Sequence, residues 1–404
     1  MKRPKRFLWR AEMRLHTVAR AIQWRLICIL VAEVFVPCVS VSVANGDETT
    51  ACPQERAPYK YIGDVAGGIW ARDVSFSGDS RRLVTAVDHS QKRLFRVWDI
   101  PSCKPVKEPL RHDDAVSARL TSDGQVLFTA SDHEVRLWDV QTSAVRSVTN
   151  MDGEVGFAKI SPDGTRFITQ NRNDWSALQL WRAGEHKPFA ELRHNGEVVQ
   201  SAAFDDTGAK IVSFVSTRSR SFRLWDGKTG AETSVPVNSS LLLMNPDAQV
   251  ASFTSGGKRI VIARNDGFAM LDVSTGQILS TGELAGEVKT EGVVVSGEGA
   301  TVAVETWDPN VKEHGFVEIF DAVTGKHSWT IGKGPIIRCC ITPDGMWLLC
   351  CSIQPGVAQL WNLANGKMVQ TFPANIGGMS PDGNTIAICE KDKGTTSIWR
   401  RHEK

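Results

Sequence analysis

The sequence lacks the short motifs that mark the commonest catalytic and metal sites. It contains no Gly-x-Ser-x-Gly nucleophile elbow, no His-Glu-x-x-His helix, no Walker loop and no EF-hand pattern. It also contains no Cys-x-x-Cys pair and no Cys/His cluster with the spacing of a zinc site. We therefore expect no cofactor, no bound metal and no catalytic residues, and we interpret the chain as a non-enzyme.

The chain also lacks a large excess of charge of either sign. Its 404 residues include 47 Lys or Arg and 45 Asp or Glu, and the small basic surplus lies at the N-terminus. Residues 1–44 hold eight basic and two acidic residues, which leaves 39 basic and 43 acidic residues in the rest of the chain. A nucleic-acid-binding domain would need a basic stripe on its folded part. The bulk charge therefore argues against a nucleic-acid partner.

The N-terminal segment has the parts of an export signal. A basic stretch leads into an apolar run from Leu26 to Val36, which is followed by Pro37 and by small residues before a cut after Ala44. The expected organisation is a signal peptide or signal anchor at 1–44, a linker at 45–55, the folded domain at 56–401 and a tail at 402–404. This organisation predicts an exported domain, either periplasmic or secreted.

The alternative is an uncleaved membrane anchor, because residues 26–44 are nearly long enough to span a bilayer. Against it, Glu33 inside the segment costs about 2.5–3.5 kcal/mol on insertion scales, and Pro37 interrupts the helix. Lipid attachment at Cys38 is disfavoured because no small residue precedes it in the required place. In each case the folded domain lies outside the cytoplasm, with membrane contact only through an uncleaved leader.

Seven of the nine cysteines would survive the cut, and an odd number cannot all pair. The neighbours in Cys339-Cys340 and in Cys350-Cys351 would point to opposite faces of a strand, and we interpret these four as small buried apolar residues. Cys52 with Cys103 is the one candidate disulfide to test in an oxidising compartment.

What the sequence does contain is a pattern that recurs eight times. An apolar strand end is followed by a four-residue polar turn, a second β-rich run and a third strand that closes on an aromatic or apolar residue. The turns lie at 77–80, 121–124, 161–164, 205–208, 254–257, 296–299, 342–345 and 380–383. Pro presets φ in such a turn, Asp or Ser bonds its own backbone, and Gly tolerates a positive φ.

The closing positions set the size of the repeat. They are Trp98, Trp138, Trp181, Trp225, Leu271, Phe320, Trp361 and Trp399. Their separations of 38 to 49 residues are typical of one propeller blade. Eight turns and eight closing positions predict an all-β propeller of eight four-stranded blades, and seven blades are the fallback if residues 277–325 are irregular. The segment Pro58–Ile62 is expected to supply the outer strand of the last blade and so close the ring.

The units Phe95–Asp99, Val135–Asp139 and Phe222–Asp226, together with the Ser-Pro-Asp-Gly turns, resemble the WD40 repeat family. The resemblance covers residues 56–401. It implies a WD40-like β-propeller that serves as a scaffold for binding a protein or peptide, without catalysis.

In that family, a His, a Ser or Thr, an Asp and the closing Trp form a hydrogen-bonded set that stiffens the blade. Only the second repeat approaches this set, with His112, Thr129, Asp132 and Trp138, and His194 in the fourth repeat matches the His alone. The resemblance therefore implies structural roles for both histidines and blades held mainly by packing.

Candidate partner-binding residues lie on loops between second and third strands, which family members gather on one face with the loops entering the first strands. They are Asp88, His89, His133, Asp174, Trp175, Arg218, Arg220, Asp266, Trp307 and Asp308. An exposed Trp is a frequent interface anchor, although Trp175 and Trp307 could instead fold back over their own blades. Arg218 and Arg220 could clamp a carboxylate or phosphate, or they could simply be solvated.

A second function remains open at this point. An enzyme or small-ligand receptor could use the axial funnel if carboxylates, histidines or metal ligands from different blades converged there. We favour the scaffold, as a monomeric propeller whose protein or peptide partner is not identified by the sequence.

Overall fold

The computed structural model describes residues 58–66, 71–89, 92–215, 222–233, 250–254, 257–264, 266–284, 288–307, 315–334, 336–352, 356–374, 376–390 and 395–402. All of these lie in one compact unit, Glu55–Lys404. The expected leader, Cys52, Arg218, Arg220 and Asp308 lie outside the described residues. Among the described residues, no helix has the length and apolar character needed to cross a bilayer.

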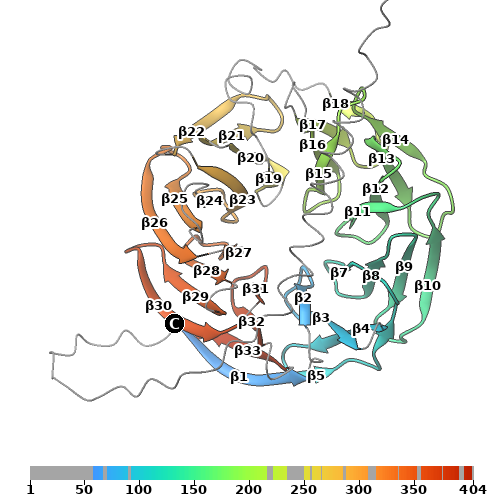
Figure 1. Cartoon of the computed structure of the whole chain (residues 1–404), viewed down its shortest axis with the longest axis horizontal. Helices are drawn as coiled ribbons and strands as arrows, with labels where there is room; N and C mark the ends of the chain where they lie inside the picture. The colour runs from blue at the N-terminus through green and yellow to red at the C-terminus, as the bar shows by residue number, and fades with distance from the viewer. Residues whose placement is uncertain are drawn as a thin grey trace, which may run out of the picture. The chain divides into compact units, whose positions relative to one another are not determined.

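The described strands form eight antiparallel sheets that follow one another around a ring (Figure 1). Each sheet is one blade, and the chain passes through each blade from its inner to its outer strand before entering the next. The eight-bladed all-β propeller is thus confirmed, and the described parts of 277–325 form regular strands of blades five and six.

The first four blades take up the first half of the ring. Blade one contains β2 (Ala71–Phe76), β3 (Arg82–His89), β4 (Lys92–Asp99), β5 (Lys104–Pro105) and β6 (Leu110–Arg111). Blade two contains β7 (Ser117–Leu120), β8 (Val126–Ala130), β9 (Glu134–Asp139) and β10 (Val145–Asn150). Blade three contains β11 (Val155–Ile160), β12 (Arg166–Asn171), β13 (Asp174–Arg182) and β14 (Ala190–Arg193). Blade four contains β15 (Val199–Phe204), β16 (Lys210–Val215), β17 (Phe222–Asp226) and β18 (Glu232–Thr233).

The last four blades complete the ring. Blade five contains β19 (Val250–Phe253), β20 (Arg259–Arg264), β21 (Gly267–Asp272) and β22 (Ile278–Glu283). Blade six contains β23 (Lys289–Val295), β24 (Thr301–Trp307), β25 (Gly315–Asp321) and β26 (His327–Gly334). Blade seven contains β27 (Ile336–Ile341), β28 (Trp347–Ser352), β29 (Val357–Asn362) and β30 (Lys367–Pro373). Blade eight contains β31 (Ile376–Met379), β32 (Thr385–Glu390), β33 (Thr395–Arg401) and, from the start of the domain, β1 (Tyr59–Ala66).

Strand β1 closes the ring, as the sequence predicts. It pairs antiparallel with β33 from Tyr59 opposite Arg401 to Ala66 opposite Thr395. The ring of Tyr59 is buried, and its hydroxyl donates a hydrogen bond to the carbonyl of Gly383 in blade eight. The pairing covers an edge of β33 that would otherwise be open to other chains.

The hydrophobic core is divided into eight clusters, one at each interface between neighbouring blades. Phe95 of blade one and Trp138 of blade two share one cluster, and Leu349 of blade seven and Ile386 of blade eight share another. Because each blade is covered by a neighbour on both faces, a second strand such as Val126–Ala130 is buried at every position. Burying a side chain of this size contributes about 1.5–3 kcal/mol.

The four-residue turns add polar links between neighbouring blades. The backbone N–H of Asp79 donates to the carbonyl of Ser122 at 2.7 Å, and the N–H of Ser122 donates to the carbonyl of Pro162 at 2.8 Å. Within a turn, burial acts to raise the pKa of Asp163, but hydrogen bonds from Ser161 and Thr165 outweigh it and lower that pKa to about 2. The turns therefore stiffen the end of the ring on which they lie.

Candidate functional site

The loops that enter the first strands and the loops between second and third strands lie at the same end of each blade, because the strands alternate in direction. We call this end the loop face. In blades two and three it is formed by residues 111–116, 131–133, 151–154 and 172–173.

A buried histidine, His112, joins the loop face of blade two to the second strand of the blade. His112 Nδ1 lies 2.7 Å from Thr129 Oγ1, and the indole Nε1 of Trp138 donates to the same oxygen at 2.9 Å. Since Thr129 accepts the indole hydrogen, we assign its own hydroxyl hydrogen to His112 Nδ1. Burial is the main cause that lowers the pKa of His112 to about 4, with a further contribution from Arg136. The ring is therefore neutral near pH 7 and acts structurally.

The acidic neighbour of His112 differs from the one that the resemblance implies. His112 Nε2 faces the carboxylate of Glu134 at 3.4 Å, whereas Asp132 lies 3.9 Å from the guanidinium of Arg172 in blade three. Glu134 is the first residue of β9, and its carboxylate is also paired with Arg136. Glu134, rather than Asp132, is therefore the acidic residue beside His112. Asp132 lies instead near Arg172 on the loop face.

Blade four contains a second His–hydroxyl–Trp set, so the expectation that His194 matches the repeat alone is wrong. His194 Nε2 lies 2.7 Å from Ser213 Oγ, and Trp225 Nε1 donates to that oxygen at 2.8 Å. The other ring nitrogen of His194 lies 3.2 Å from the carbonyl of Ser176, to which it donates. Burial lowers the pKa of His194 to about 4, so this ring is neutral as well.

Blades one and three keep the Trp–hydroxyl bond. Trp98 Nε1 donates to Thr85 Oγ1 at 3.0 Å, and Trp181 Nε1 donates to Thr169 Oγ1 at 2.9 Å. In all four blades the hydroxyl residue lies opposite the residue that stands two positions before the closing Trp. That register is the sequence signal for these bonds. In the first half of the ring, a Trp–hydroxyl bond in each blade is therefore added to the hydrophobic packing between blades.

The loops of blades two and three form one connected surface. Arg172 pairs with Glu154 at 3.0 Å within blade three and also approaches Asp132 of blade two. The N–H of Met151 donates to the carbonyl of His133 at 2.9 Å. Gly153 has a φ of 120°, and a Cβ there would lie 2.7 Å from Asn173 Nδ2, so only glycine fits this approach.

A hollow of about 490 Å³ opens on the loop face of blade two. We call it the acidic hollow; it is lined by Arg111, His112, Asp113, Asp114, Ser131, Asp132, His133, Glu134 and Arg136. Four carboxylates stand against two guanidinium groups, and both arginines are already paired, Arg111 with Asp113 and Arg136 with Glu134. With His112 neutral, the lining has an excess of negative charge.

The structure brings three of the candidate partner-binding residues to this region. His133 is exposed in the acidic hollow, and Asp174 and Trp175 begin β13 at the loop face of blade three, just after Arg172, which approaches Asp132. Trp175 is 45% exposed rather than folded flat over its blade. A hydrogen bond from the Ser176 hydroxyl lowers the pKa of Asp174, which keeps this carboxylate charged. Sequence reasoning missed Glu134, Asp113 and Asp114, although they directly follow the two histidines in the chain.

The other candidates lie elsewhere on the ring. Asp88 and His89 end β3 rather than lying in a loop, because the hairpin of blade one extends to the pair His89–Lys92. Trp307 ends β24 in blade six, where it is half-buried, and Asp266 lies between β20 and β21 of blade five. The candidates that the structure describes are therefore spread over five of the eight blades.

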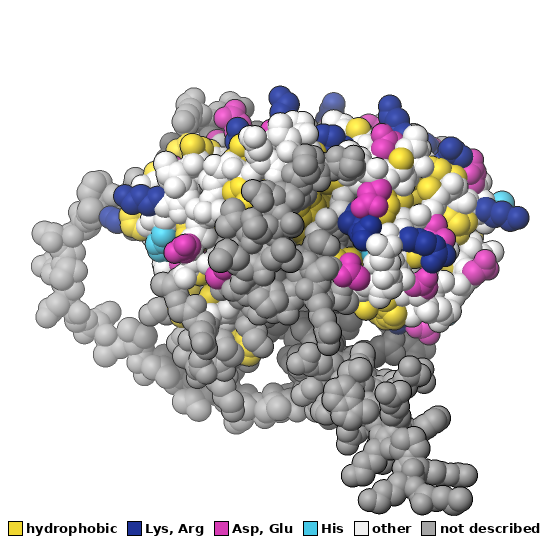
Figure 2. All heavy atoms as spheres, turned by 90° about the horizontal axis from the view of Figure 1, so that it is seen from above, with side chains coloured by type: hydrophobic (Ala, Val, Ile, Leu, Met, Phe, Trp, Pro, Cys, Tyr) yellow, Lys and Arg dark blue, Asp and Glu magenta, His cyan; other side chains and the backbone are white. Residues whose placement is uncertain are grey.

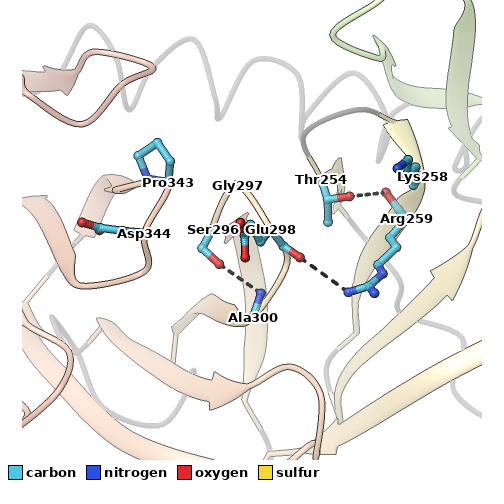
Figure 3. A pocket seen from close by; sticks show the side chains of 9 residues that line it. All are labelled: Thr254, Lys258, Arg259, Ser296, Gly297, Glu298, Ala300, Pro343 and Asp344. Atoms are coloured by element: carbon cyan, nitrogen blue, oxygen red, sulfur yellow. Dashed lines mark hydrogen bonds between the residues drawn. The ribbon is translucent and has the colours of Figure 1, made fainter.

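A larger hollow of about 750 Å³ lies at the opposite end of the ring, among the turns of blades five to seven. Figure 3 shows that several of its polar groups bond within or between these turns: Ser296 bonds the N–H of Ala300, and Arg259 bonds the carbonyl of Glu298. Asp344 is paired with Arg401 at 2.9 Å. Because these groups are used by the turns, this hollow is a weaker candidate than the acidic hollow.

Comparison with known proteins supports the same architecture. Residues 103–139, which run from the outer strands of blade one through the first three strands of blade two, match the family described as WD domain, G-beta repeat. The fold is that of a WD40-type propeller. The β-propeller domain of Cps50 (Swd1) from Myceliophteria thermophila aligns over 85% of this chain and 100% of its own length, with a TM-score of 0.53 and 14% identity. Such a low identity shows a shared fold alone.

A serine-threonine kinase receptor-associated protein from Dictyostelium discoideum is 25% identical over 133 residues. The match covers 33% of this chain and 44% of the relative, so less than half of that protein is represented. The blade that matches the repeat family is the blade that carries the complete His–Thr–Trp set and the acidic hollow.

Proposed function

We propose that this protein is a non-catalytic scaffold that binds a basic segment of a protein or peptide on the loop face of blades two and three. The observation that carries the proposal is the acidic hollow of blade two, which the Arg172–Asp132 contact links to the loop of blade three that leads into the exposed Trp175. Lys or Arg side chains of a partner would meet Asp114 and Asp132, and an apolar residue would pack on the Trp175 ring.

The rest of the ring supports a partner of this kind. In the view of Figure 2, basic and acidic side chains are interspersed over the visible surface of the ring, so the acidic hollow stands out by its confined negative lining rather than by bulk charge. The Dictyostelium relative is named for its association with a receptor kinase, which is also a protein partner. Among the described residues, no group of three or more His, Cys, Asp or Glu is placed to hold a metal ion.

The binding proposal is tested by selecting peptides from a random display library on the immobilised full chain. We expect enriched peptides to contain Lys or Arg beside an aromatic or aliphatic residue, and to bind less tightly as salt rises. Trp175→Ala and the pair Asp114→Asn with Asp132→Asn should each weaken binding about tenfold or more. Leu279→Ala is the matched control, because Leu279 is exposed to 46% on the outer strand of blade five.

Enriched peptides that bind the Trp175→Ala and acidic variants as well as the unchanged protein would place the site elsewhere and contradict the proposal.

We further propose that the domain acts outside the cytoplasm as a monomer, released from or anchored by residues 1–44. The leader composition supports this address. N-terminal sequencing of the protein recovered from its own host should give either a chain that begins at Asn45 or, if the anchor is kept, a full-length chain in the membrane fraction. A chain that keeps residues 1–44 and fractionates with the cytoplasm would contradict the address without affecting the binding proposal.

A further inference from the structure

Blade seven has a closing Trp but lacks the hydroxyl that such a Trp bonds in blades one to four. Cys350 on β28 lies opposite Gln359, which stands two positions before Trp361. This is the register at which the other blades place Thr85, Thr129, Thr169 and Ser213. The buried Nε1 of Trp361 has no hydrogen-bond partner, so blade seven lacks the polar link that ties the second and third strands of those blades.

The sulfur of Cys350 is directed instead to the inner strand. Cys339 on β27 lies directly opposite Cys350, and its thiol donates to the Cys350 sulfur at 3.4 Å. Both side chains are buried in the cluster between blades six and seven. The two thiols are thus held together by the same register that leaves Trp361 without a partner.

The backbone geometry suits a bond between these two residues. The N–H of Cys339 donates to Glu305 Oε1 of blade six at 2.8 Å, so it points away from β28. Cys339 and Cys350 are therefore a non-hydrogen-bonded pair, for which the Cα atoms are about 4.5 Å apart. Disulfides span Cα separations of about 4.4–6.8 Å, so rotation of the side chains is enough to join the sulfurs.

We propose that Cys339 and Cys350 form a cross-strand disulfide that fastens blade seven where the Trp–hydroxyl bond is missing. The oxidant is a disulfide of the surrounding compartment. One cysteine thiolate attacks it, forming a mixed disulfide and releasing one thiolate; the second cysteine thiolate attacks the mixed disulfide, closes the Cys339–Cys350 bond and releases the other. The two protons of the cysteines end on the two released thiolates.

The timing of this step follows from burial. In the folded ring, desolvation raises the pKa of Cys339 far above its usual value, and the contact with Cys350 raises it further. A thiol in that state rarely ionises, and only the thiolate reacts. The bond therefore closes while blade seven is still open during folding. The proposal depends on the address outside the cytoplasm only for its oxidant in the cell.

The chain contains its own control pair. Cys340 and Cys351 lie on the opposite face of the same two strands, in the cluster shared with blade eight, and are not paired in register, since Cys340 lies opposite Leu349. Replacing both by Ser leaves only Cys339 and Cys350 in blade seven, which removes ambiguity from peptide mapping.

The experiment uses the full chain, unchanged and with Cys340→Ser plus Cys351→Ser, refolded in a mixture of glutathione and glutathione disulfide. Remaining thiols are alkylated after denaturation, and the chain is cleaved before Asp344. We expect the two resulting peptides to be joined through Cys339 and Cys350. Reduction should lower the Tm of both proteins by about 4 °C, which is the loss expected when a disulfide that closes a 12-residue loop is broken in a domain of this size. The Tm of the Cys339→Ala variant should not change on reduction.

Alkylation of both Cys339 and Cys350 in the refolded chain, or a bond between Cys340 and Cys351 in its place, would overturn the proposal. A second variant tests the register argument under reducing conditions. Cys350→Thr should raise Tm above that of the reduced unchanged protein, because the new hydroxyl can accept the Trp361 indole hydrogen. A Tm below that of the reduced unchanged protein would mean that Cys350 does not occupy the position at which Thr129 accepts the indole hydrogen of its closing Trp. A bond formed on refolding but absent from protein isolated from its host would contradict the proposed address alone.

Discussion

At the scale of single residues, the most consequential group is one hydroxyl that serves two rings. Thr129 accepts the indole hydrogen of Trp138 and donates to His112, so it joins the second strand of blade two to the third strand and to the loop above it. Removing such an oxygen leaves two buried polar groups without partners, and each costs about 1–3 kcal/mol. The same logic applies to Ser213 in blade four.

We expect Thr129→Val to lower the free energy of unfolding by about 2–6 kcal/mol, measured by urea denaturation. Thr169→Val is the matched control, because Thr169 bonds only Trp181 among the contacts described and should cost about 1–3 kcal/mol. Equal losses for the two variants would mean that the bond to His112 contributes nothing to stability.

The two buried histidines predict a loss of stability in mild acid. Their pKa values fall from 6.5 in the unfolded chain to about 4 in the ring, so the unfolded chain binds more protons between these values. The stabilisation is complete above pH 6.5 and is lost as the pH falls to 4, by at most about 3 kcal/mol for each ring. Urea midpoints at pH 7, 5.5 and 4.5 measure this loss. His112→Gln should remove about half of this loss and leave the share of His194, whereas His133→Gln on the exposed loop should leave the loss unchanged.

At the scale of elements, the strands and turns were predictable and the polar bonds between them were not. The turns and closing aromatics recur at a fixed period, and each directly encodes a hairpin or a strand end. Ser213 was missed because its partner depends on which residue of β17 lies opposite it, and register is not visible in a list of motifs. Glu134 displaced Asp132 beside His112 for a similar reason, since the direction in which a side chain leaves β9 decides the contact.

Strand β1 gives a prediction at this scale. A chain that starts at residue 67 lacks β1, exposes the edge of β33 and loses the buried ring of Tyr59. We expect it to form concentration-dependent oligomers in sedimentation experiments, because an open edge pairs with other chains. A chain that starts at residue 56 removes the leader and linker but keeps β1, and should remain monomeric. A monomeric chain from residue 67 would show that closure is not needed to protect the edge.

At the scale of the whole molecule, the two halves of the ring differ in the residue that the second strand places at the register position of Thr129, although Trp399 of blade eight still donates to a hydroxyl, that of Ser397 on its own strand. Blades one to four tie their second and third strands with Trp–hydroxyl bonds. In blades five to eight the equivalent positions hold Ile262, Val304, Cys350 and Ile388. The sequence shows that the closing residues diverge in blades five and six. The strand register is needed to show which second-strand residue lies near each closing residue.

This partition predicts where acid opens the ring. At pH 4.5 the histidines of blades two and four are close to the pH at which they gain charge, whereas blades five to seven hold no equivalent buried histidine among the residues described. Hydrogen exchange, corrected for the intrinsic rate at each pH, should lose protection first in β7–β9 and β15–β17 and later in β20–β29. His194→Gln should restore protection in blade four alone. Simultaneous loss around the whole ring would instead mean that the eight interfaces unfold as one cooperative unit, and that the two sets stabilise the molecule globally rather than their own blades.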